Sequence, residues 1–189
     1  IGLPHTLLPQ AEEILRASSL WADQASRSEY LAQVRWRLRL DFDGLSSPVA
    51  HAQYFPDDLF RLSEDEVFVD CGAYDGDSLR DFASRLPGFK GEFIAVEPDP
   101  NNLRSLEESV AALPESWRSR VTILPTAVGA RRETVHFAAT GLASAGVSPT
   151  GTLEVESVPL DEILEGSRPT FIKMDIEGAE LAALQGTTR

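Results

Sequence analysis

The sequence is poor in cysteine and in basic residues. Cys71 is the only cysteine among 189 residues, which excludes an intrachain disulfide and a zinc site built on cysteines. Lys and Arg total 17 against 30 Asp and Glu, so the formal net charge is -13. Because nucleic acids and anionic membranes are recognised through a cationic face that neutralises phosphate, this charge argues against both as partners.

Long hydrophobic runs are also lacking. No apolar stretch approaches the roughly 18 residues of a transmembrane helix, and no signal-type segment is seen, so we expect a soluble, cytoplasmic protein. The remaining composition is ordinary, with 42% hydrophobic and 25% charged residues. These values rule out a disordered or collagen-like chain. The length fits one domain, or one domain with a helical appendage.

The first 60 residues have the spacing of helices. Apolar residues recur there at helical intervals, and Ser26 with Glu29 matches a capping box, in which the Ser26 side chain would accept from the Glu29 amide. We predict a helical N-terminal cap over residues 1–60, packed on a domain over residues 61–189. The cap contains no motif with a recognisable chemical role.

From residue 67 onward, short apolar runs alternate with amphipathic segments. This alternation predicts a doubly wound parallel α/β sheet, because parallel strands are joined by helical crossovers. The predicted strands lie at 67–71, 93–96, 121–124 and 171–175. The predicted helices lie at 79–86, 100–113 and 177–184, and Gly186 is placed to end the last of them.

Residues 130–160 have a different pattern. Residues 134–138 and 154–158 alternate polar and apolar side chains, which is typical of half-exposed strands. Thr140–Thr152 between them is rich in Gly, Ser and Ala. We predict that this segment is a mobile loop over the carboxyl edge of the sheet, where it forms a lid or an entrance.

The first site motif follows the strand at 67–71. Asp70 ends that strand, and Gly72-x-x-x-Gly76 leads from it into a helix. Such a turn lets the backbone pass close under a ligand, and the helix N-terminus offers unpaired amides to an anionic group. The middle glycine of the dinucleotide fingerprint is absent, and no Gly-Lys-Ser/Thr of a P-loop follows. A plain tight turn is the alternative interpretation.

Two acids end other predicted strands of the same sheet. Glu97 stands about 20 residues beyond Gly76, where nucleotide-binding folds place an acid on the ribose hydroxyls. Asp175 ends the fourth strand at the same carboxyl edge, where open α/β sheets bind ligands. A solvated acid is the alternative for Glu97. Lys173 shares a face with Asp175, and we favour a buried ion pair over a substrate contact for this lysine.

These residues resemble those of the FkbM-type methyltransferases, class I enzymes that depend on S-adenosyl-L-methionine. The resemblance covers roughly residues 55–186, and its most specific part is the string Lys173-x-Asp-x-Glu-Gly-x-Glu180 after the Glu97-Pro98 acid. It implies a Rossmann-like fold and methyl transfer to an oxygen, most readily a hydroxyl of a sugar or another small molecule.

The resemblance also implies roles for individual residues, which can be grouped by the part of the cofactor they would contact. The implied contacts are Asp70, Gly72, Ala73 and Gly76 around the methionine part, Glu97 at the ribose with Pro98 and Asp99 along the adenosine, Thr126 and Ala127 at the adenine, and Asp175 near the methionine amino group and the methyl. A hydroxyl acceptor must lose its proton, and Asp175 and Glu177 are the candidate bases and catalytic residues. No convincing metal constellation is found, although these two acids could hold Mg²⁺.

The chain departs from the family pattern at its end. Such methyltransferases continue with three more strands, which this sequence lacks, so the fourth strand would be an unprotected edge. A trimmed chain, a missing tail and a homo-oligomer in which a second chain covers the edge are the three explanations. Two other functions stay open. One is a nicotinamide-dependent oxidoreductase, disfavoured by the missing middle glycine, and the other is a binding module without turnover.

Overall fold

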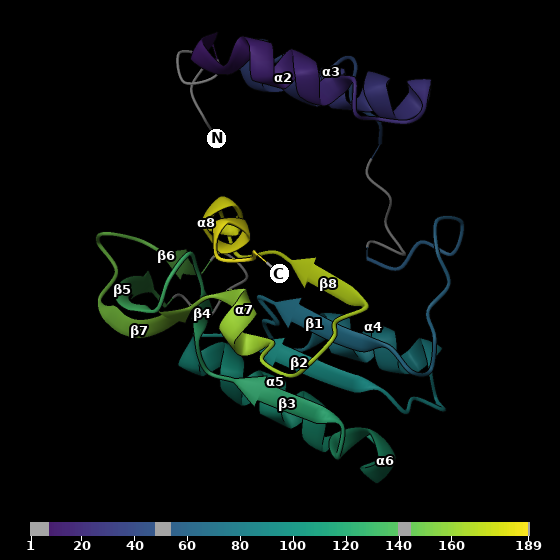
Figure 1. Cartoon of the computed structure of the whole chain (residues 1–189), viewed down its shortest axis with the longest axis vertical. Helices are drawn as coiled ribbons and strands as arrows, with labels where there is room; N and C mark the ends of the chain where they lie inside the picture. Colours follow the sequence, from purple (N-terminus) through teal and green to yellow (C-terminus); the bar gives the residue numbers. More distant parts are fainter. Residues whose placement is uncertain (1–7, 48–53, 140–144, 189) are drawn as a thin grey trace. The chain divides into compact units, whose positions relative to one another are not determined.

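The computed structural model describes residues 8–47, 54–139 and 145–188 (Figure 1). The chain divides into two compact units, Ile1–His51 and Ala52–Arg189. Each unit is described by itself below.

The first unit is helical, as predicted. A 3-10 turn, η1 (Leu8–Gln10), leads into α2 (Ala11–Ser18), and α3 (Gln24–Arg39) follows. The capping-box prediction is wrong. Asp23 caps α3 by accepting a hydrogen bond from the Ser26 backbone amide at 2.8 Å, because its carboxylate stands three residues before that free amide.

The second unit contains the predicted parallel sheet. Within the described residues it has four strands in the order β3-β2-β1-β8, and each neighbouring pair is parallel. Figure 1 shows these strands side by side in that order. Their bounds are β1 Val67–Cys71, β2 Glu92–Val96, β3 Val121–Leu124 and β8 Phe171–Met174.

Helices cover both faces of this sheet, which confirms the doubly wound architecture. Alternate strand residues point to opposite faces, so Phe68 and Phe93 join one hydrophobic cluster, while Val69 and Ile94 join another. The first cluster includes side chains of three helices: α4 (Asp77–Arg85), α5 (Pro100–Ala111) and α6 (Glu115–Arg118). The second cluster includes side chains of α7 (Leu160–Ile163) and α8 (Glu180–Gln185).

An aromatic group forms the centre of the first cluster. Phe55 is 1% exposed and its ring lies 5.6–5.7 Å from those of Phe68, Phe82 and Phe171. Residue 55 therefore belongs to the core of the second unit. The boundary between the units lies before residue 54 rather than at the predicted 60/61, because the burial of this aromatic segment ties it to the sheet.

The pattern of residues 130–160 produces a second sheet, in the order β4-β7-β5-β6. His136 is exposed between half-buried Val135 and buried Phe137, so the predicted alternation is confirmed. Residues 140–144 of the predicted loop lie outside the described residues. Two later residues of that loop are instead a strand that pairs antiparallel with β5. The bounds are β4 Ala127–Val128, β5 Glu133–Ala138, β6 Gly146–Val147 and β7 Leu153–Val158.

The last helix begins later than predicted. The structure places Glu177 and Gly178 in a turn with φ of 55° and 96°, which a right-handed helix cannot contain. The Glu180 carboxylate then accepts from the backbone amides of Ile176 and Gly178, and α8 begins at Glu180. Glu177 is consequently exposed on a turn.

Candidate ligand site at the carboxyl edge

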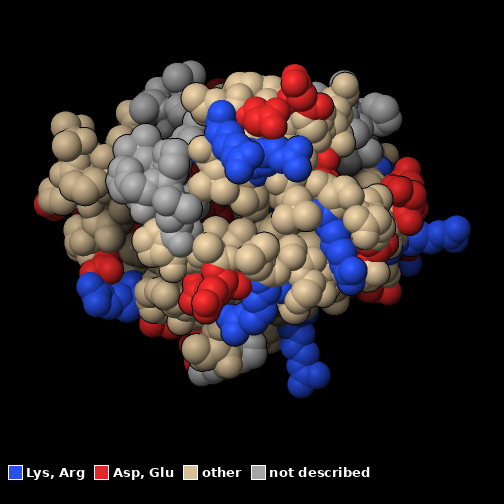
Figure 2. Space-filling view, turned by 90° about the horizontal axis from the view of Figure 1, so that it is seen from above, with Lys and Arg blue, Asp and Glu red and all other residues tan. Residues whose placement is uncertain are grey.

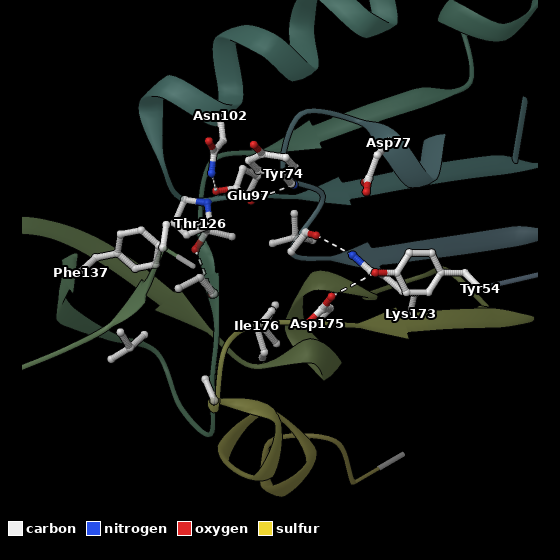
Figure 3. Close-up of a pocket in the computed structure, with 18 residues that line it drawn as sticks. Tyr54, Tyr74, Asp77, Glu97, Asn102, Thr126, Phe137, Lys173, Asp175 and Ile176 are labelled. Carbon is white, nitrogen blue, oxygen red and sulfur yellow. Dashed lines mark hydrogen bonds between the residues drawn. The ribbon is translucent and has the colours of Figure 1, made fainter. Parts of the chain in front are cut away.

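A cavity of about 290 Å³ opens between the carboxyl ends of the parallel strands and the second sheet (Figure 3). Its walls come from the residues that follow β1, β2, β3 and β8 and from strands of the second sheet. The lining residues are Tyr54, Gly72, Tyr74, Asp77, Val96, Glu97, Pro98, Asn102, Thr126, Ala127, Val128, Phe137, Ala145, Val147, Lys173, Asp175, Ile176 and Ala179. Parallel strands bring these distant segments to one edge, as the sequence predicts.

The turn after β1 allows two strand ends to come together. Gly72 has φ of 83°, and a Cβ on it would collide with the carbonyl oxygen of Asp175. A glycine is therefore required here, although the neighbour it admits is the end of β8 rather than a ligand. Tyr74 also has a positive φ, 49°, and its ring and backbone lie at the cavity.

Glu97 lies at one end of the cavity with three donors around its carboxylate. Oε2 accepts from the Tyr74 amide at 3.0 Å, and Oε1 accepts from the Asp99 amide at 2.9 Å and from Asn102 Nδ2 at 3.3 Å. Burial raises the pKa of Glu97, and these hydrogen bonds act in the opposite direction. Glu97 is a held, buried carboxylate, so the alternative of a solvated acid is wrong.

Lys173 forms the buried ion pair that the sequence favours. Its Nζ lies 3.0 Å from Asp70 Oδ1 and donates to the Gly72 carbonyl at 2.7 Å. Asp70 is fully buried, and the loss of solvation raises its pKa to about 6, although the Lys173 charge lowers it. The pair ties β8 to β1 and to the turn that follows β1.

Asp175 lies at the opposite end of the cavity from Glu97, beside Tyr54 and Lys173 (Figure 3). Its side chain is exposed, and Oδ2 accepts a hydrogen bond from the Tyr54 hydroxyl at 3.1 Å. The described residues bring no three His, Cys, Asp or Glu side chains into metal-binding geometry at any point.

The structure brings some of the predicted site residues to the cavity and places others behind it. Those that line the cavity are Gly72, Glu97, Pro98, Thr126, Ala127 and Asp175. The others lie elsewhere in the fold: Asp70 under Lys173, Ala73 in the aromatic cluster, Gly76 against α5, Asp99 at the cap of α5, and Glu177 on the turn before α8.

Sequence reasoning missed several side chains that line the cavity. Asn102 and Asp77 lie in the first turns of α5 and α4, and the helix starts that follow Glu97 and Gly76 were the signal that could have located them. Phe137 and Val147 reach the cavity from the second sheet, and no local pattern indicates this. Tyr54 lies in the segment before the predicted sheet, where the sequence shows no motif with a recognisable chemical role.

Some basic side chains on the surface form ion pairs with acidic ones. On the face shown in Figure 2, some Lys and Arg side chains lie beside Asp and Glu, and others project without an acidic neighbour. Arg80 pairs with Asp75, and Lys90 pairs with Glu64.

No helix in residues 8–47, 54–139 and 145–188 has the length and apolar character needed to cross a bilayer.

The doubly wound sheet and the acid-lined cavity at its carboxyl edge define a Rossmann-like protein with a ligand site at the strand ends. Residues 70–189 match the family described as the methyltransferase FkbM domain. Because this match covers more than half of the chain, the chain belongs to the FkbM methyltransferase family. The resemblance found in the sequence is thereby confirmed.

Two relatives support the assignment. The hexuronic acid methyltransferase AglP of Haloferax volcanii is 28% identical over 138 residues, which are 69% of this chain and 53% of that protein. The crystal structure of methyltransferase FkbM from Methylobacillus flagellatus KT superposes with a TM-score of 0.79 at 27% identity. The superposition covers 97% of this chain and 45% of the chain in that crystal structure. The chain thus spans about half the length of these relatives. Neither supports a nicotinamide-dependent oxidoreductase.

Proposed function

We propose that this chain binds S-adenosyl-L-methionine in the carboxyl-edge cavity and transfers its methyl group to a hydroxyl of a small molecule or sugar. The observation that carries the proposal is the pair of carboxylates, Glu97 and Asp175, at the ends of β2 and β8 on the same cavity. The family assignment supports the same activity.

The residues present fit this cofactor. Its ribose offers two vicinal hydroxyls, and the Glu97 carboxylate is an acceptor already held in place by three donors. Its methionine part carries positive charge, which suits the acidic groups Asp77 and Asp175. The adenine requires an apolar slot, and Val96, Ala127 and Phe137 line the cavity beyond Glu97.

The cofactor supplies a methyl group already activated on a sulfonium, so the chain's main tasks are alignment and exclusion of water. We assign Glu97 to the ribose, and we assign Asp175 to the methyl end. Asp175 Oδ2 is engaged by Tyr54, so Oδ1 is the oxygen that accepts the proton of a hydroxyl acceptor.

Residues behind the cavity wall support those that line it. In this proposal Asp70, Ala73, Gly76 and Asp99 act by holding the turn after β1 and the start of α5, rather than by contact with the cofactor. Glu177, predicted as a second catalytic acid, is assigned no contact here.

The acceptor class is proposed from one relative. AglP is named as a hexuronic acid methyltransferase, and we propose a sugar as the acceptor for this chain, with a hydroxyl, as predicted from the sequence, as the methylated group. Four statements stay predictions: that the helical N-terminal segment packs as a cap on the following domain, that a homo-oligomer covers the β8 edge, that nucleic acid is not a partner, and that the location is cytoplasmic.

Calorimetric titration with S-adenosylhomocysteine and, separately, with NAD tests the proposal. We expect saturable binding of S-adenosylhomocysteine and none of NAD. Binding of NAD alone, or of neither compound, would overturn the cofactor assignment. Binding of S-adenosylhomocysteine with no methyl transfer across a panel of neutral and acidic sugars would instead indicate a binding module without turnover.

A further inference from the structure

Tyr54 lies outside the region that matches the family, which begins at residue 70, and yet its side chain lines the cavity. Figure 3 shows it together with Lys173 and Asp175. A residue that precedes the sheet in sequence therefore forms part of the same site as the end of β8.

The Tyr54 hydroxyl contacts Asp175 directly. It donates to Asp175 Oδ2 at 3.1 Å, and no other hydrogen bond to that side chain is found among the described residues. Burial, followed by the hydrogen bond to Asp175, raises the pKa of Tyr54 to about 12. The phenol thus keeps its proton at neutral pH and remains a donor.

The Tyr54 ring contacts the neighbouring charge. Lys173 Nζ lies 5.1 Å from the ring centroid, within the range of a cation–π contact. The same ammonium group is held from the other side by Asp70 and the Gly72 carbonyl. One tyrosine therefore touches both charged side chains at the end of β8.

The position of Tyr54 is set by its neighbour in the chain. Phe55 is buried at the centre of the aromatic cluster, and its carbonyl accepts from Arg85 Nη1 at 3.1 Å. The backbone at residues 54 and 55 is consequently anchored to both the sheet and α4. The hydroxyl reaches Asp175 from a fixed base rather than from a free loop.

We propose that Tyr54 is a positioning residue of the site: it holds the exposed Asp175 carboxylate toward the cavity, so that this charge is already oriented for the positive part of the cofactor. Asp175 follows β8, and Tyr54 is the hydrogen-bond donor found for its side chain among the described residues. An oriented carboxylate loses less conformational entropy when a ligand binds. This inference rests on the proposed function and adds a residue to its site.

A double-mutant cycle tests the inference through binding of S-adenosylmethionine, measured by calorimetry. The variants are Tyr54→Phe, Asp175→Ala and the two combined, and Tyr30→Phe is the control. Tyr30 donates to the Ile14 carbonyl in the first unit, so its variant also loses one tyrosine hydrogen bond. Tyr54→Phe removes the hydroxyl and keeps the ring over Lys173.

We expect Tyr54→Phe to weaken binding by about tenfold, as for loss of a hydrogen bond to a charged group. The affinity of Tyr30→Phe should stay within twofold of wild type. The melting temperatures of Tyr54→Phe and Tyr30→Phe should fall by similar amounts. In the Asp175→Ala background, Tyr54→Phe should change the affinity by less than twofold, because its action passes through Asp175.

Two results would overturn the inference while leaving the proposed function intact. One is wild-type affinity in Tyr54→Phe. The other is a double variant whose fold-loss of affinity equals the product of the losses in Tyr54→Phe and Asp175→Ala, because the two residues would then act independently. If the wild-type chain binds neither S-adenosylmethionine nor S-adenosylhomocysteine, both the proposed function and this inference are overturned.

Discussion

The two carboxylates of the cavity are held in different ways. Glu97 is buried and accepts from three donors. Two of them, on Asp99 and Asn102, lie just after Glu97 in the chain, and the third is the backbone amide of Tyr74. Asp175 is exposed, and its hydrogen bond comes from Tyr54, which is 121 residues away in sequence. The comparison teaches that the β2 end of the site is built mainly by local chain geometry, whereas the β8 end depends on long-range packing.

The largest expected effect is at the β8 end. Asp175→Asn keeps the size of the side chain and removes its charge and basicity, so turnover should fall by about 10²–10⁴-fold. Stability should change by less than about 1 kcal/mol, since Lys173 pairs with Asp70 and not with Asp175. Initial rates with a sugar acceptor and urea unfolding measure the two quantities. A large loss of stability with activity preserved would give Asp175 a structural role instead.

The next effect concerns the anchor of Tyr54. Phe55→Ala should lower the free energy of unfolding by about 3–5 kcal/mol, because it leaves a cavity among packed aromatic rings. Phe42→Ala is the matched control, since Phe42 is 60% exposed, and it should change stability by less than about 0.5 kcal/mol. Similar urea midpoints for both variants would show that the β8 end does not depend on this packing.

At the β2 end, Glu97→Ala should weaken S-adenosylhomocysteine binding by roughly 10- to 100-fold, as expected for loss of charge-assisted hydrogen bonds. From the sequence, the melting temperature of the unliganded protein would be nearly unchanged. The structure revises this expectation, because alanine leaves the buried amides of Tyr74 and Asp99 without their acceptor.

Glu97→Gln is the more conservative variant at this position. It keeps one of the two acceptor oxygens, so only one of the backbone amides of Tyr74 and Asp99 loses its acceptor, and the loss of stability should be smaller than in Glu97→Ala while binding is still weaker than in wild type. Calorimetry and thermal unfolding on both variants check this. Unchanged affinity in Glu97→Ala would remove Glu97 from the proposed cofactor site.

The last effect is a pH dependence from Asp70, which is small within any one pH unit. Its pKa is about 6 in the folded protein against an ordinary 3.8, so the folded state binds more protons between those values. Its contribution to stability is therefore complete below about pH 4 and is lost as the pH rises through about 6. Asp70→Asn cannot titrate at this position and serves as the reference. Relative to it, the free energy of unfolding of wild type should fall by at most about 1.4 kcal/mol per pH unit in this window. Urea unfolding between pH 4 and 7 measures the difference, and a flat difference would contradict it.

Much of the β2 end could be predicted from sequence. The strand at 92–96 is a buried apolar run, Glu97 follows it directly, and Asp99-Pro100 marks the helix start that the structure confirms. These signals are local, because a strand, its terminal acid and the next helix cap are read from about ten consecutive residues. The donors to Glu97 were not predicted, and Asp99, which was expected along the adenosine, caps α5 instead.

The β8 end was predicted less well. The strand and the position of Asp175 were found, and the Lys173 ion pair was favoured. The late start of α8, the short strand β6 and the partner of Asp175 were missed. The start of α8 is set locally, by the turn at Glu177 and Gly178 and by the Glu180 carboxylate. The strand β6 and the partner of Asp175 depend instead on pairing and packing between separate segments, for which the sequence carries no periodic signal.

By itself, the sequence determined the doubly wound sheet, the edge at which the site lies, and the acids that end β2 and β8. Hydrophobic periodicity and strand polarity are sufficient for these, because parallel strands place all their carboxyl ends together. Only the tertiary structure decided which residues face the cavity. Asp70 and Asp99 are drawn into the interior by partners nearby, and Tyr54 is brought to Asp175 by the burial of Phe55, an interaction that exists only once the aromatic core has packed.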